Sequence, residues 1–160
     1  MIKGIYALRN IKINKKKLFK LATKIELERL KSPIGYQDQA AAIYGGMNYF
    51  KFTKKNISVK KIYLKNNEIK FFNKFYIYWT GRERSANKIL NDVNKNIKLN
   101  LESLNYIRDL TDKYYYKIKK KLLYSDLIEM INESWKTKVK FSKKITNSRI
   151  SNLISLLKKS

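Results

Sequence analysis

One carboxylate, Asp38, stands out among the residues that could do chemistry. It lies between two amides, Gln37 and Gln39, within the segment GYQDQAAAIYGG from Gly35 to Gly46. The chain has no histidine and no cysteine, which excludes a histidine base, a thiolate nucleophile and the zinc ligand sets. Catalysis within this chain must therefore rest on carboxylate, lysine, tyrosine or serine side chains, with any metal ion held by oxygen ligands.

The residues after Asp38 predict how the fold holds this carboxylate. They indicate a short helix over Gln37 to Tyr44 that ends at Gly45-Gly46, because glycine takes the left-handed conformation that follows a helix. Unpaired amide groups and the helix dipole then favour an ionised carboxylate at the start of the helix. Such a group can accept or orient a hydroxyl proton. The alternative is that Asp38 only caps the helix, and spacing alone favours this alternative.

The remaining elements predict an α+β fold. Apolar residues at spacings of three and four indicate an amphipathic helix from Lys15 to Leu30, stopped by Ser32-Pro33. Segments rich in aromatic and β-branched residues predict strands at Met47 to Phe52, Ile57 to Leu64 and Phe71 to Trp79. Further helices are expected at about 83–97, about 100–121, about 123–137 and about 147–158. The change from strands to helices near Thr80-Gly81 predicts a change of layer or domain.

The net charge of +25 comes from 37 basic and 12 acidic residues. Arginine, whose planar fork suits phosphate recognition, makes up only six of the basic residues. Lysine, asparagine, isoleucine and tyrosine together are what an AT-rich genome imposes on a protein, so we interpret most lysines as a solvated face. The alternative is a small basic nucleic-acid-binding protein whose 12 tyrosines stack on bases, with Tyr114 to Tyr116 as the first place to look. Nucleic acid is not the expected partner.

The sequence shows no secretory signal, and apolar runs such as Phe75 to Trp79 are too short to cross a bilayer. We expect a cytoplasmic location and no membrane partner.

The motif GxQDQxAAxxGG resembles the sugar-kinase form of a GHMP kinase motif, and most of all the form found in D-glycero-D-manno-heptose 7-phosphate kinases. It consists of Gly35, Gln37, Asp38, Gln39, Ala41, Ala42, Gly45 and Gly46. Three flanking segments are similar to the same group in the same order: the helix from Leu18 to Leu30, the stretch from Tyr78 to Arg82, and Trp135 with Lys138.

This resemblance implies phosphoryl transfer from ATP to a hydroxyl of a sugar or sugar phosphate, in which a kinase mainly positions groups and neutralises charge. Asp38 would be the catalytic carboxylate, and Gly35, Gln37 and Gln39 would bind the substrate. Glu26, 12 residues before Asp38, would ligate Mg²⁺, which needs only one or two protein ligands.

Each further position has an alternative. Glu28 competes with Glu26, and Glu26 could instead be an exposed residue paired with Lys24 or Arg29. Arg82 and Lys138 could contact a substrate phosphate or belong to the solvated surface.

The sequence departs from the family in lacking a Gly/Ser-rich loop that would hold the ATP phosphates. We therefore expect a central fragment of a GHMP fold, truncated at both ends. Residues 1–80 would be the end of its N-terminal domain and 81–160 the first, mainly helical part of its C-terminal domain. Such a fragment would not be a competent kinase alone, and a complementary kinase fragment is the expected protein partner.

Overall fold

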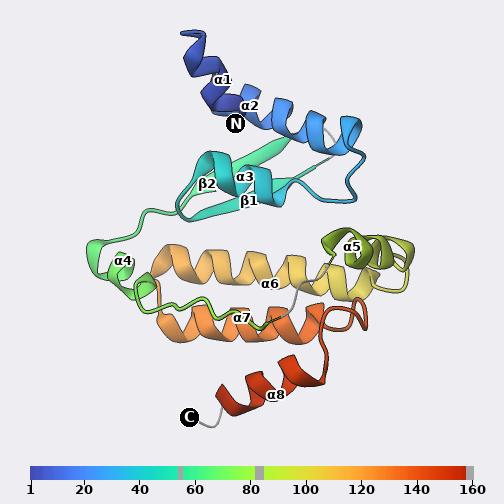
Figure 1. Cartoon of the computed structure of the whole chain (residues 1–160). Helices are drawn as coiled ribbons and strands as arrows, with labels where there is room; N and C mark the ends of the chain where they lie inside the picture. Colours follow the sequence, from blue (N-terminus) through green and yellow to red (C-terminus); the bar gives the residue numbers. More distant parts are fainter. Residues whose placement is uncertain (54–55, 82–84, 158–160) are drawn as a thin grey trace. The chain divides into compact units, whose positions relative to one another are not determined.

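The computed structural model describes residues 1–53, 56–81 and 85–157, and it divides the chain into two compact units, Met1–Lys65 and Asn66–Ser160 (Figure 1). Helices and one small antiparallel sheet make up the described residues, so the predicted α+β class is confirmed. The predicted division between the family's domains, at residues 80 and 81, remains a prediction.

The first unit combines helical segments with a β-hairpin. Its elements are α1 (Ile2–Leu8), α2 (Lys15–Thr23), the π-helix η1 (Lys24–Arg29), α3 (Gln37–Tyr44), β1 (Asn48–Phe52) and β2 (Ile57–Lys61). Helix α2 begins where Asn14 Oδ1 accepts a hydrogen bond from the backbone N–H of Lys17 at 2.8 Å, which satisfies one of the free amides of its first turn. Helix α3 has the predicted bounds and ends at Gly45, whose φ is 62°.

The hairpin pairs β1 with β2 in antiparallel register, with Phe50 opposite Val59 and Phe52 opposite Ile57. Helix α3 packs against β1 and α2 packs against α3, as Figure 1 shows for this unit. The ring of Tyr44 meets that of Phe50 edge-on at 6.0 Å. These contacts hold α3 against both α2 and the hairpin.

The second unit is mainly helical. Its elements are α4 (Asn66–Phe72), α5 (Ala86–Lys95), α6 (Leu101–Lys120), α7 (Tyr124–Lys138) and α8 (Ser148–Leu157). Helices α6 and α7 pack side by side (Figure 1). The buried side chains of this unit include Leu110, Tyr114, Ile118, Leu122, Leu127 and Ile150. Four helices predicted from periodicity, α5 to α8, are confirmed within a few residues of their expected bounds.

The predicted strand from Phe71 to Trp79 is wrong. Residues up to Phe72 belong to α4, where Phe71 stacks on Tyr124 with ring centroids 3.6 Å apart. Residues 75–80 are irregular, and they pair with no strand among the described residues. Tyr76 and Ile77 are almost fully exposed, at 91% and 102%. Aromatic and β-branched residues favour a strand only where a neighbouring strand and a packed face exist to receive them.

The tyrosine cluster on α6 faces two ways. Tyr114 is fully buried, at 0% exposure, and Tyr116 is 62% exposed. Burial, with the nearby carboxylate of Glu129, raises the pKa of Tyr114. The three adjacent rings therefore do not form a shared stacking surface, which was the reason to look there first for base binding.

A polar contact fixes the connection between α7 and α8. Ser142 Oγ donates a hydrogen bond to Asp92 Oδ2 on α5, and Lys144 Nζ lies 3.3 Å from Asp92 Oδ1. Asn100 Nδ2 donates to the carbonyl of Phe141 at 3.2 Å. Sequence periodicity predicted the helices on either side but not these contacts.

Candidate active site

Asp38 lies in the first turn of α3 with its side chain exposed. The N-cap residue is Tyr36, and no side chain caps this helix. Among the described residues, none forms an ion pair with Asp38. The carboxylate is therefore placed at a helix N-terminus, as predicted, and is free to meet a ligand.

The helix before the motif changes from α-helical to π-helical geometry, which the sequence did not predict. The predicted α-helix from Lys15 to Leu30 changes at Lys24 into the π-helix η1. The backbone N–H of Leu30 donates to the carbonyl of Ile25, five residues earlier, at 2.9 Å. Short π-helical turns are rare and occur often at functional sites. Glu26 lies within this turn and is half-buried.

The π-helix brings Glu26 to the QDQ motif. Gln39 Nε2 donates a hydrogen bond to Glu26 Oε2, and the Gln39 side chain turns inward, leaving the residue 8% exposed. The other amide atom, Gln39 Oε1, is buried and has no hydrogen-bond partner among the described residues. A buried acceptor without a partner costs free energy, so the contact with Glu26 holds Gln39 in this position at some cost.

The half-buried carboxylate of Glu26 is an oxygen ligand of the kind that Mg²⁺ accepts, and Mg²⁺ needs only one or two such ligands from a protein. Within the described ranges, no group of three or more acidic side chains could hold a metal by itself. The sequence offers no Gly/Ser-rich loop for the ATP phosphates.

The other predicted site residues lie partly in the first unit and partly in the second. Gly35 and Gln37 are exposed on either side of Tyr36. Glu28, the competitor of Glu26, is exposed and does not contact Gln39 in the way that Glu26 does. Lys138 is exposed at the end of α7, in the second unit. Arg82 lies outside the described residues.

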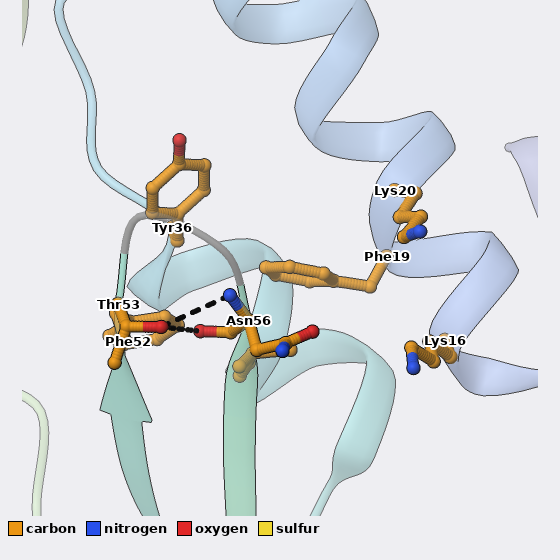
Figure 2. A pocket seen from close by; sticks show the side chains of 8 residues that line it. Lys16, Phe19, Lys20, Tyr36, Phe52, Thr53 and Asn56 are labelled. Atoms are coloured by element: carbon orange, nitrogen blue, oxygen red, sulfur yellow. Dashed lines mark hydrogen bonds between the residues drawn. The ribbon is translucent and has the colours of Figure 1, made fainter.

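Sequence reasoning missed a hollow in the first unit, shown in Figure 2. It has a volume of about 140 Å³ and is lined by Lys16, Phe19, Lys20, Tyr36, Phe52, Thr53, Asn56 and Ile57. The available signal was Phe19 on α2 with a lysine on each side, three and one residues away. That pattern did not indicate that Tyr36 and Phe52 would lie beside Phe19.

Comparison with known proteins shows what the chain is similar to. Residues 1–46 match the family model described as GHMP kinases N terminal domain, and this match includes Glu26 and Asp38. The chain is 28% identical over 167 aligned residues to a D-glycero-alpha-D-manno-heptose 7-phosphate kinase of Campylobacter jejuni, an alignment that covers 98% of this chain and 47% of the relative. The predicted resemblance to GHMP kinases of the heptose kinase type is confirmed.

The chain thus spans about half the length of the curated relative it matches. No solved structure matches it. None of the helices in the described part of the chain has both the length and the apolar character needed to span a membrane.

Proposed function

We propose that this chain provides the acceptor side of a sugar-kinase active site, with Asp38 as its catalytic carboxylate. The observation that carries the proposal is the hydrogen bond between Gln39 and Glu26, which assembles the motif and the predicted metal ligand within the matched residues 1–46. The reaction is the ATP-dependent phosphorylation of a sugar or sugar phosphate, and the printed name of the relative suggests a heptose 7-phosphate as acceptor.

Each residue has a role in this scheme. The exposed carboxylate of Asp38 accepts or orients the proton of the attacking hydroxyl. Glu26 would hold Mg²⁺, and the ion would supply positive charge that neutralises the transferred phosphoryl group. Gly35 and Gln37, both exposed, contact the sugar. Gln39 is buried and holds the carboxylate of Glu26 in place. The contacts of Arg82 and Lys138 with a substrate phosphate remain predictions from the sequence.

The phosphate-binding loop is the part that another polypeptide segment would have to supply. We therefore propose that this chain alone is not a competent kinase and that a complementary kinase fragment is its partner. Titration of ATP·Mg²⁺ into the chain by calorimetry tests this point. We expect no binding in the micromolar range, and ordinary micromolar affinity would contradict the proposal.

A chimera tests the role of Asp38. In it, this chain replaces the matched segment of the Campylobacter jejuni kinase, and transfer of phosphate to the heptose 7-phosphate is measured. We expect activity in the chimera, and a loss of about 10²–10⁴-fold in the Asp38→Asn variant because proton transfer by a positioned group contributes that much. The matched control is Asp109→Asn, which alters an exposed aspartate on α6 and should leave activity unchanged. An active Asp38→Asn chimera, or a folded chimera without activity, would overturn the proposal.

A further inference from the structure

The hollow in the first unit, named here the aromatic hollow, has a chemistry that the kinase proposal does not use. Its walls come from α2, from the segment before α3 and from the two ends of the hairpin connection (Figure 2). Neither Asp38 nor Glu26 lines it. Tyr36 lies between Gly35 and Gln37 of the proposed kinase site, but none of the residues that line the hollow has a role in that proposal.

Three rings form the apolar part of the aromatic hollow. Tyr36 stacks on Phe52 with ring centroids 5.9 Å apart and an angle of 30° between the planes. Phe19 lies 6.2 Å from Tyr36 and is tilted by 53°. Phe19 is buried, at 7%, whereas Tyr36 and Phe52 remain 44% and 37% exposed. The hollow thus combines a buried floor with two rings that a flat ligand can reach.

Cations and hydrogen-bonding groups surround these rings. Lys16 and Lys20 lie one turn apart on α2, on either side of Phe19, and both are exposed (Figure 2). Neither forms an ion pair with a described residue. A second depression, of about 430 Å³, lies along the same helix and is lined by Asn14, Lys16, Lys17 and Lys20. Positive charge therefore continues from the aromatic hollow along α2.

The size of the aromatic hollow limits what it can hold. Sites that enclose a free small molecule usually measure about 300–1,000 Å³, and this one measures about 140 Å³ and opens to solvent. One planar ring fits, but a whole nucleotide would remain mostly outside. A strand of nucleotides avoids this limit, because one base can stack while its phosphates follow the lysines.

We propose that the aromatic hollow binds single-stranded nucleic acid, with one base stacked on Tyr36 and Phe52 and the adjacent phosphates on Lys16 and Lys20. The composition, rich in lysine and poor in arginine, favours a solvated face for most of the lysines. The structure places two aromatic rings at the surface beside two lysines that form no ion pair with a described residue. Proteins that bind single strands combine stacking rings with positive charge in this way.

Fluorescence anisotropy with a labelled oligothymidylate of about 15 residues and the full chain tests the aromatic contact. Stacking of one base contributes about 1–3 kcal/mol, so Tyr36→Leu should weaken binding about 5-fold to 150-fold, and Tyr36→Phe should retain it. The matched control is Tyr116→Leu, which removes an exposed ring on α6 and should change the affinity less than twofold. Equal losses for Tyr36→Leu and Tyr116→Leu, or a loss in Tyr36→Phe, would overturn the proposal.

A charge-matched pair of double variants tests the phosphate contacts. Each phosphate neutralised on a single strand adds about 0.7 to the slope of log affinity against log salt. The variant K16Q/K20Q should reduce the slope by about 1.4, and K119Q/K120Q, with the same charge change on exposed lysines of α6, should leave it unchanged. Equal slopes for both variants would assign binding to net charge and overturn the proposal.

Two further ligands complete the test. Free thymidine monophosphate should compete only weakly, and the corresponding duplex should bind less tightly than the single strand at equal salt. Strong competition by the monophosphate would indicate a small-molecule site, and tighter duplex binding would indicate a site for backbone charge alone; either result contradicts the proposal. Asp38→Asn should bind the single strand normally, which separates this proposal from the kinase function.

Discussion

Gln39, on the inner side of α3, donates a hydrogen bond to the carboxylate of Glu26, 13 residues earlier in the π-helix η1. This bond joins the motif that carries Asp38 to the segment that carries the predicted metal ligand. The rare π-helical turn and the buried amide are thus two parts of one arrangement.

Replacement of Gln39 by leucine should loosen this arrangement. A hydrogen bond to a charged group contributes about 1.5–3 kcal/mol, and removal of the unpartnered Oε1 offsets part of the loss. We expect the free energy of local opening to fall by about 1–2 kcal/mol, measured as faster hydrogen exchange of the α3 amides by mass spectrometry. Gln37→Leu, at an exposed neighbour, is the control. Equal acceleration in both variants would show that the contact with Glu26 does not hold α3.

Gly45 should tolerate a side chain much less well than Gly35. Gly45 has φ 62° and ψ 163°, a conformation that is essentially restricted to glycine and costs other residues about 1–3 kcal/mol. A Cβ on either glycine would meet nothing within 4 Å, and only Gly45 has a positive φ. Urea unfolding followed by circular dichroism should therefore show a loss of about 1–3 kcal/mol for Gly45→Ala and less than about 0.5 kcal/mol for Gly35→Ala. A destabilised Gly35→Ala would contradict this account, and a stable one allows the proposed substrate contact at Gly35 to be tested separately.

The helices could be predicted from the sequence because their signals are local. The bounds of α3 follow from small residues ended by Gly45, and α2 begins at the predicted Lys15 after its Asn14 cap. The strand expected at Phe71 to Trp79 could not be excluded in this way. Whether aromatic residues form a strand depends on a partner strand elsewhere in the chain. The local sequence pattern does not show whether such a partner exists.

The candidate site was predictable in part for the same reason. The position of Asp38 at a helix start follows from its own neighbours. The choice between Glu26 and Glu28 cannot be made from neighbouring residues, because it depends on how η1 turns toward Gln39. The spacing of apolar residues does not reveal a π-helical turn. The aromatic hollow joins Phe19, Tyr36 and residues of the hairpin, which only the tertiary fold brings together.

Tyr114 provides a test of the helical core in the second unit. Its hydroxyl is buried without a hydrogen-bond partner among the described residues, whereas its ring fills the core and lies 5.1 Å from Lys113 Nζ and 5.3 Å from Lys117 Nζ. Tyr114→Phe should therefore change the free energy of unfolding by less than about 1 kcal/mol, and Tyr114→Ala should lower it by about 3–5 kcal/mol. Both tryptophans of the chain, Trp79 and Trp135, lie in this unit, so their fluorescence during urea unfolding measures the effect. A large loss in Tyr114→Phe would reveal a partner for the hydroxyl.

Asp92 should make the second unit sensitive to acid. The hydrogen bond from Ser142 and the neighbouring Lys144 lower the pKa of Asp92 below its ordinary value of 3.8. A carboxyl group with a lowered pKa in the folded state stabilises the fold above the unfolded value, and this contribution is lost as pH falls through the folded pKa. Asp92→Asn should therefore lower the urea midpoint of tryptophan fluorescence at pH 7, with the difference from the wild type shrinking progressively below about pH 3.8. Carboxyl carbon NMR should give Asp92 a titration midpoint below 3.8 that rises in Ser142→Ala, because Ser142 is the largest cause of the shift. An unchanged midpoint in Ser142→Ala would show that Lys144, and not the buried serine, holds the carboxylate in its ionised form.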